Sequence, residues 1–147
     1  MKTTPKANET FEQWFKRMKF RNFSADEFTS YFNVKRRGTR NSAPPKSKWT
    51  NIVPALRIVD DLRDYFGRPC VINSSYRSEA YNKSCGGASK SLHKEFKALD
   101  ISFSAVRPHD VRDKLIEWRR EGRFKGGVGR YNTFTHIDTR GYNATWG

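Results

Sequence analysis

The sequence predicts an α+β fold, in which helices come first and a small antiparallel sheet follows. Apolar residues recur at helical spacing in three segments, which are residues 10–18, 50–67 and 108–122. Residues 97–103 instead alternate between apolar and polar side chains, and the segments 126–129 and 134–138 indicate a closing hairpin. Helices that precede a separate group of strands are typical of α+β domains.

Each of the three helices is marked by a start or stop signal. The first begins with the capping-box pattern of Thr10 and Gln13. The second carries Pro54 in its first turn, where proline is tolerated, and ends at Gly67, while Pro108 opens the third. The residues predicted to face the core are Phe11, Trp14, Phe15 and Met18, then Val53, Leu56, Val59, Leu62 and Phe66, then Val111, Leu115 and Trp118.

Shorter elements are predicted between these helices. A second capping pattern predicts a short helix over residues 24–31, and residues 69–73 predict a strand with Val71 and Ile72 buried. Residues 33–48 are basic and rich in turn-forming residues. We predict that they form a loop, which either borders a cleft or is a solvated connector.

The chain is strongly basic, with 29 Lys and Arg against 15 Asp and Glu and a formal net charge of +14. Such a charge favours anionic partners, either nucleic acid or the anionic bacterial envelope. No zinc-finger spacing, helix-turn-helix signature or RNA-recognition motif is present, and no run approaches the roughly 20 apolar residues that span a bilayer. Cys70 and Cys85 form either a disulfide or two free thiols; the default expectation is two free thiols, with Cys70 packed at the start of a strand.

Two of the three histidines lie in short segments that also carry carboxylates. His93 precedes Asp100 by seven positions, and His136 lies far downstream beside Asp138. An unpaired carboxylate in the middle of an alternating strand is costly to bury, and a metal ion removes that cost. Two imidazoles and one carboxylate, with a fourth position open for water, are the ligands of a catalytic zinc site. We therefore predict one Zn²⁺ per chain, bound by His93, Asp100 and His136. The alternative is that Asp100 only accepts hydrogen bonds from a neighbouring strand or an arginine. We place His109 on the surface.

These segments resemble the M15 family of zinc peptidases, the group of D-alanyl-D-alanine carboxypeptidases and peptidoglycan endopeptidases. The matching motifs occur in the family's order and are Ile72–Ser78, Tyr81-Asn82, Gly86–Ala88, Ser91–Asp100, Gly127–Tyr131, Phe134–Gly141 and Trp146. The resemblance implies the architecture shared by D-alanyl-D-alanine peptidases and the hedgehog signalling domain. It implies a single zinc peptidase domain over residues 1–147, with an N-terminal helical part and basic loop (1–48) and a catalytic core (49–147).

The resemblance also implies roles for individual residues. The three metal ligands map onto His93, Asp100 and His136, and Arg77 resembles the arginine that binds substrate and stabilises the transition state. Ser91 and Tyr131 are expected to contact substrate.

Two positions depart from the family pattern. Phe96 stands where the family usually has glycine, and Thr133 stands where many members carry a catalytic acid. Asp138 is therefore our candidate for the general base, with orientation of a metal ligand as its alternative role. Glu95 is a weaker candidate for the base.

The implied function is zinc-dependent hydrolysis of amide bonds in peptidoglycan peptides, in the manner of a bacteriophage endolysin. Two alternatives are a non-catalytic peptidoglycan-binding module of the same fold and a basic nucleic-acid-binding protein. The partners expected are peptidoglycan and anionic polymers of the cell envelope, and the chain is expected to be a monomer. The start of the chain has no apolar signal segment. We therefore expect a protein made in the host cytoplasm that reaches the wall through a holin or as part of a virion.

Overall fold

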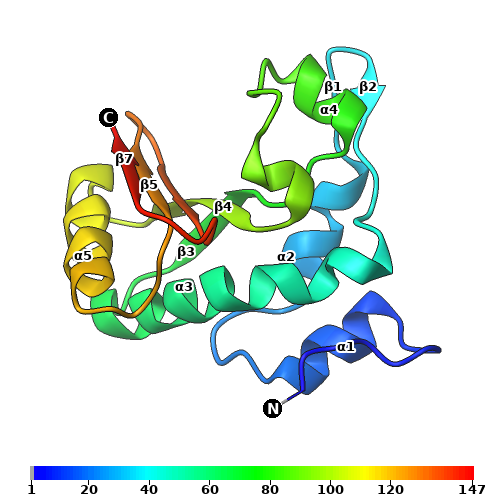
Figure 1. Cartoon of the computed structure of the whole chain (residues 1–147), viewed down its shortest axis with the longest axis horizontal. Coiled ribbons are helices and arrows are strands. Elements are labelled where there is room, and N and C mark those ends of the chain that lie inside the picture. The colour runs from blue at the N-terminus through cyan, green and yellow to red at the C-terminus, as the bar shows by residue number, and fades with distance from the viewer. Residues whose placement is uncertain (1) are drawn as a thin grey trace.

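Short N-terminal helices pack against one long central helix (Figure 1). In the computed structural model, which describes residues 2–147, these helices are α1 (Phe11–Met18), α2 (Asp26–Thr29) and the central α3 (Val53–Phe66). Two 3₁₀ helices, η1 (Tyr31–Asn33) and η2 (Lys46–Ile52), connect them. The predicted capping box of Thr10 and Gln13 is present at the start of α1, and Gly67 ends α3 with a φ of 62°.

Five strands form one sheet in the order β3-β4-β6-β5-β7. Their bounds are β3 (Cys70–Ser74), β4 (Ala98–Phe103), β5 (Gly127–Arg130), β6 (Thr135–Asp138) and β7 (Ala144–Trp146). All neighbouring strands are antiparallel except β5 and β7, which run parallel. The predicted hairpin is β5–β6, whereas the parallel edge strand β7 was not predicted.

The two faces of the sheet differ in character because the strand register places unlike side chains on them. Leu99, Ile137 and Val128 are paired across β4, β6 and β5 and are each fully buried. They join one core with the buried faces of α3 and of α5 (Pro108–Arg120). One residue further along, Asp100 pairs with His136, which faces Gly129 on β5. This second row carries the polar site.

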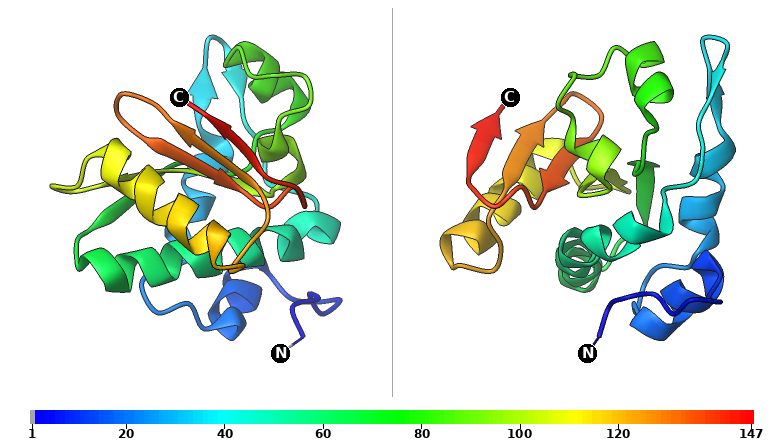
Figure 2. Two further views of the ribbon diagram at one scale, coloured as in Figure 1. Left: turned by 60° about the vertical axis from the view of Figure 1, so that its left-hand side comes forward. Right: turned by 45° about the vertical axis from the view of Figure 1, so that its right-hand side comes forward.

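The remaining elements form a lobe on the side of the molecule away from the edge strand β7 (Figure 2, right). It consists of α4 (Glu79–Ser84), the 3₁₀ helix η3 (Leu92–Glu95) and the two-stranded hairpin β1 (Lys35–Arg36) and β2 (Thr39–Arg40). Ser84 on α4 donates a hydrogen bond to Thr39 on β2, 2.6 Å away, so the helix and the hairpin support each other. The basic segment predicted as a loop therefore contains a hairpin.

The predicted core residues of the three main helices are buried, apart from the half-buried Phe66. The prediction that Val71 is buried was wrong, because its side chain is 60% exposed. Val71 and Ile72 point to opposite faces of β3, and β3 is an edge strand whose outer face meets solvent. Both cysteines are free, and burial raises the pKa of the Cys70 thiol to about 12.

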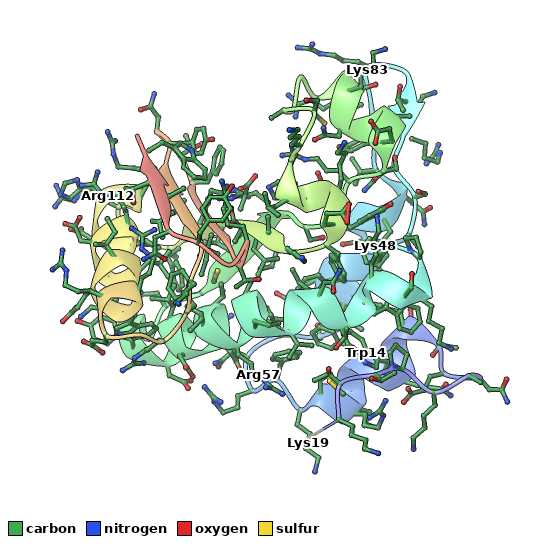
Figure 3. All side chains as sticks on the ribbon, in the orientation of Figure 1. Trp14, Lys19, Lys48, Arg57, Lys83 and Arg112 are labelled. Atoms are coloured by element: carbon green, nitrogen blue, oxygen red, sulfur yellow. The ribbon has the colours of Figure 1, made fainter. Side chains whose placement is uncertain are left out.

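Aromatic side chains fill the space between the N-terminal helices and the start of β4. They are Phe11, Trp14, Phe15, Phe28, Phe32, Trp49 and Phe96. Burying each ring contributes about 1.5–3 kcal/mol, so this cluster holds the N-terminal helices on the rest of the chain. Labelled basic side chains such as Lys19, Arg57 and Arg112 instead point outward (Figure 3). Among the helices of residues 2–147, none combines the length and the apolar composition that a membrane-spanning segment requires.

Candidate metal centre

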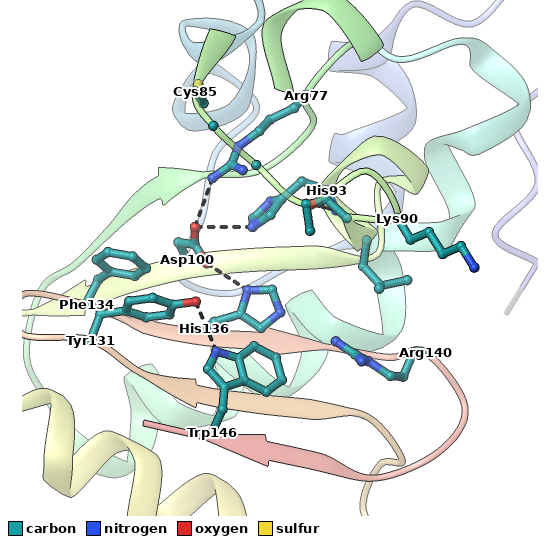
Figure 4. A pocket seen from close by; sticks show the side chains of 15 residues that line it. Arg77, Cys85, Lys90, His93, Asp100, Tyr131, Phe134, His136, Arg140 and Trp146 are labelled. Atoms are coloured by element: carbon teal, nitrogen blue, oxygen red, sulfur yellow. Dashed lines mark hydrogen bonds and ion pairs between the residues drawn. The ribbon is translucent and has the colours of Figure 1, made fainter. Parts of the chain in front are cut away.

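Three buried side chains from separate elements converge at the sheet face that lies toward the α4 lobe (Figure 4). His93 comes from η3, Asp100 from the middle of β4, and His136 from β6. The His93 Nε2 atom lies 3.2 Å from Asp100 Oδ2, and His136 Nδ1 lies 2.9 Å from Asp100 Oδ1. The antiparallel register brings Asp100 and His136 side by side, and the η3 turn brings His93 over them.

Hydrogen bonds to the backbone fix the orientation of His93. Its Nδ1 atom lies 2.7 Å from the carbonyl oxygen of Ser75, and because a carbonyl only accepts, Nδ1 carries the hydrogen. The Nε2 lone pair therefore points toward Asp100, and this buried atom has no hydrogen-bond partner within residues 2–147. The backbone N–H of Arg77 donates to the carbonyl of His93 at 3.1 Å, which ties the turn to the end of β3.

Asp138 holds His136 from the opposite side. Its Oδ2 atom accepts a hydrogen bond from His136 Nε2 at 2.7 Å, which directs Nδ1 toward Asp100. Asp138 is fully buried, and its two oxygens also accept from the backbone N–H of Gly127 at 2.8 Å and from the Arg140 guanidinium at 2.7 and 2.9 Å. A carboxylate that orients a metal-binding histidine through its far nitrogen is a recurring arrangement in metal sites.

The pKa values follow from this crowding. Burial raises the pKa of Asp100, but the His93 and His136 imidazoles lower it by more, so the pKa stands well below its usual value. Burial lowers the pKa of His136, but Asp100 and Asp138 raise it by more, so the pKa stands above its usual value. The centre therefore attracts positive charge, which is either a proton on His136 or a metal ion.

The three side chains fit a zinc ion. One nitrogen or oxygen from each of His93, Asp100 and His136 lies within 4.8 Å of the others. With Zn–N and Zn–O bonds of about 2.0–2.2 Å, ligands of a tetrahedral zinc lie roughly 3.3 Å apart. The two imidazole nitrogens lie 3.2 and 2.9 Å from the nearer oxygen of Asp100. The unpartnered Nε2 of His93 would gain a partner from the ion. Bound zinc supplies a polarised water and a positive charge for a carbonyl oxygen.

Arg77 lies beside this centre and above a cavity of about 500 Å³ (Figure 4). Its Nη2 atom is 3.4 Å from Asp100 Oδ2, its Nε donates to Ser74 Oγ at 3.0 Å, and its Nη1 donates to Asn82 Oδ1 at 3.3 Å. A Cβ at Gly87 would lie 2.2 Å from that Asn82 oxygen, so only glycine leaves room for this support of the arginine.

The structure places the other predicted residues as follows. Ser91 lines the cavity, and its Oγ accepts from the backbone N–H of His93 at 3.2 Å, so it also caps the η3 turn. Tyr131 lines the cavity with its ring stacked on Phe134 at 4.4 Å between centroids. Glu95 is exposed and does not line the cavity, and its Oε1 atom lies 3.6 Å from Lys48 Nζ.

The remaining two residues lie outside the cavity. Thr133 sits exposed in the β5–β6 turn, where its carbonyl accepts from Ser102. His109 is exposed beside Asp113, as expected for a surface histidine.

Sequence reasoning missed the part played by Trp146. The residue pairs with Gly129 in the sheet, and its ring lies 5.1 Å from the His136 ring. A Cβ at Gly129 would lie 2.3 Å from the indole, so glycine lets Trp146 cross β5 and cover the histidine. The glycines of 126–129 were noticed in the sequence, but the residue that lies across them depends on the unpredicted strand β7.

Phe96 ends η3 at the position where members of the M15 family, which this segment resembles, usually have glycine. It ends η3 in the left-handed region with φ 56° and ψ 43°, a conformation that costs a residue with a Cβ roughly 1–2 kcal/mol. The ring is fully buried, with centroid distances of 6.4 Å to Phe11, 6.2 Å to Phe32 and 6.1 Å to Tyr76. Packing of the ring in the aromatic cluster offsets this backbone strain. The turn between His93 and Asp100 therefore forms although its left-handed position is not a glycine.

A buried His–Asp–His cluster at the edge of an open cavity offers the three protein ligands that a catalytic metal ion would need. Consistent with this, the family model described as Peptidase M15 matches residues 21–138. The chain belongs to the M15 family of peptidases. Separate searches of curated proteins and of solved structures returned no match.

Proposed function

We propose that this peptidase is zinc-dependent and hydrolyses amide bonds in peptidoglycan peptides. The observation that carries the proposal is the convergence of His93, Asp100 and His136, with the His93 Nε2 atom buried and unpartnered. These three residues would hold the ion, and the cavity beside them would admit the peptide.

Arg77 is the residue we assign to the substrate. Its side chain is 17% exposed and lines the cavity next to the candidate metal ligands. A guanidinium in this position can stabilise a developing oxyanion or hold a substrate carboxylate through charged hydrogen bonds. Ser74, Asn82 and Asp100 accept three of its five N–H groups, and the contact with Asp100 is long at 3.4 Å. The second N–H of Nη1 and that of Nη2 are therefore left for a substrate.

Asp138 has two candidate roles, and the geometry favours one of them. A general base must reach the water that it deprotonates, whereas Asp138 is fully buried and lies on the far side of the His136 ring from Asp100. Its bond to His136 Nε2 supports the role of positioning that ligand. The assignment of Asp138 as general base stays a prediction. Among residues 2–147, Asp100 is the one carboxylate that lines the cavity.

The charge of the chain supports an anionic substrate. The net charge is +14, and Lys90 and Arg140 join Arg77 around the cavity. Peptidoglycan peptides carry free carboxylates, and the wall is polyanionic, so a positive field would raise the rate of encounter. We include in the proposal a lytic role of the endolysin type, in which the protein acts on the wall as a monomer.

The test is digestion of purified peptidoglycan with the zinc-loaded protein, read as newly released amino groups. We expect release by the wild type, none after chelation, and recovery when zinc is restored. The variant His136→Ala should bind no zinc and release nothing, with His109→Ala as the matched control. Sedimentation with peptidoglycan without release of amino groups would refute the catalytic role and leave a wall-binding module.

A further inference from the structure

We propose that the enzyme cleaves an internal amide of an acidic peptide, and that Lys35 and Arg36 bind carboxylates of that peptide beyond the metal centre. This inference rests on the proposed function, since it names the substrate of the same site. It begins from a second cavity of about 470 Å³, which is nearly as large as the first.

The two cavities meet at the metal centre. Arg77, Cys85, Asp100 and Phe134 line both of them, so the cavities adjoin at one candidate metal ligand. From there the first cavity continues past His136 to Trp146, and the second continues past Ser74 to the hairpin. Each volume falls in the range of about 300–1,000 Å³ that holds a drug-sized ligand, so each side has room for several atoms of chain beyond a single group. An enzyme that removes one terminal residue needs a long subsite on one side only. Space on both sides fits a chain that passes through.

The second cavity is walled by the β1–β2 hairpin. Tyr31, Val34, Lys35 and Arg36 line it from the N-terminal part, opposite Asn73 and Ser74 of β3. The hairpin turns at Arg37 and Gly38, both with positive φ, and Asn41 anchors its base by donating to the Tyr76 carbonyl at 2.8 Å. The two cations are thus presented from a supported turn.

Apart from Asp100, the charged side chains that line the two cavities are all cationic. Lys35, Arg36 and Lys90 have no ion-pair partner among residues 2–147, and Asp100 is the lone acid lining either cavity. Lys90 lines the first cavity only, whereas the two hairpin cations line the second cavity only. Unpaired cations on both sides match a peptide with carboxylates on both sides of the bond that is cut.

The probe is a cross-linked muropeptide dimer isolated from a muramidase digest of peptidoglycan. Products of the zinc-loaded wild type are identified by mass spectrometry. We expect two peptide fragments of several residues each. Loss of single terminal residues alone would overturn the inference while leaving the peptidase function intact, whereas no cleavage would overturn the proposed function and this inference with it.

Binding of the same dimer by the zinc-free protein tests the hairpin separately from catalysis. The double variant Lys35→Gln/Arg36→Gln should bind roughly 3- to 10-fold more weakly at low salt, because two exposed charge pairs are lost. The control Arg37→Asn/Lys83→Gln removes the same charge from the same lobe at exposed residues that line neither cavity. Figure 3 shows Lys83 pointing outward at the far end of α4.

The control variant should bind like the wild type, and the difference between the two variants should shrink at high salt. Amidation of the carboxylates of the dimer should weaken wild-type binding and abolish the difference. Equal binding by both variants would overturn the assignment of Lys35 and Arg36 and indicate a general effect of net charge.

Discussion

The substitution Asp138→Asn distinguishes a residue that positions a metal ligand from a general base. Asp138 Oδ2 accepts from His136 Nε2 and from Arg140 Nη2, both at 2.7 Å. In asparagine the NH₂ group replaces one oxygen, and the other oxygen remains to accept from the Gly127 N–H. The NH₂ then faces His136 Nε2 as a donor. To accept from that NH₂ group, Nε2 must lose its proton, so the neutral imidazole changes tautomer and carries its proton on Nδ1, the atom that faces Asp100.

The expected result is a weaker metal site. A proton on His136 Nδ1 must be displaced before zinc binds, and loss of such an orienting carboxylate costs 10- to 100-fold in metal affinity, which is about 1.4–2.7 kcal/mol. The assay is competition for zinc with a chromogenic chelator, together with kcat at saturating zinc. We expect zinc affinity to fall and kcat at saturating zinc to recover in large part.

The opposite pattern would refute this reasoning. If Asp138 is the general base, zinc affinity stays at the wild-type value while kcat at saturating zinc falls by 10²-fold or more, on the order typical of general-base catalysis. Asp113→Asn is the matched control, because Asp113 also lies beside a histidine but is exposed. Thermal unfolding of both variants shows whether the loss of the Arg140 pair has altered the fold.

Three further predictions concern the turn, the pH dependence and the tryptophan cover. Phe96→Ala and Phe96→Gly should both lose about 3–5 kcal/mol of packing. The alanine variant should be less stable than the glycine variant by about 1 kcal/mol, because glycine relieves the positive φ of 56°. Equal free energies of unfolding for the two variants would show that the turn is unstrained. Zinc affinity should fall as the pH drops through neutrality, because the raised pKa of His136 lets a proton compete above the usual imidazole range; a pH-independent affinity measured by calorimetry would contradict this. Gly129→Ala should displace Trp146, whose ring lies 2.3 Å from the new Cβ, and lower kcat/KM with zinc affinity unchanged; wild-type kcat/KM would exclude a role for the tryptophan.

The local elements of this fold could be predicted well because their signals are local. The apolar stripes and caps of α1, α3 and α5 lie within one or two turns of helix, and burial follows from their periodicity. The β1–β2 hairpin was missed because only Gly38 of its two left-handed turn positions is a residue that favours that conformation. The strand β7 has three residues, too few to show alternation.

The candidate ligands were recognisable for two reasons. Asp100 lies in an alternating strand, where an unpaired carboxylate is costly to bury, and the motifs that carry His93, Asp100 and His136 resemble those of the M15 family. Their sequence positions, however, say nothing of which imidazole nitrogen faces Asp100. That was decided by Ser75 and Asp138, which bind the far nitrogens of the two imidazoles.

By itself, the sequence determined the helices, the hairpin that carries His136, the basic charge and the residues able to hold a metal, because each depends on residue type and short-range spacing. Tertiary structure decided the rest. Strand pairing put Asp100 beside His136, and the aromatic core held Phe96 in a turn it would not adopt alone. The β1–β2 hairpin and residues of β3 and β4 together line a second cavity. These features join residues distant in the chain, and the free energy that holds them comes from packing that no local pattern records.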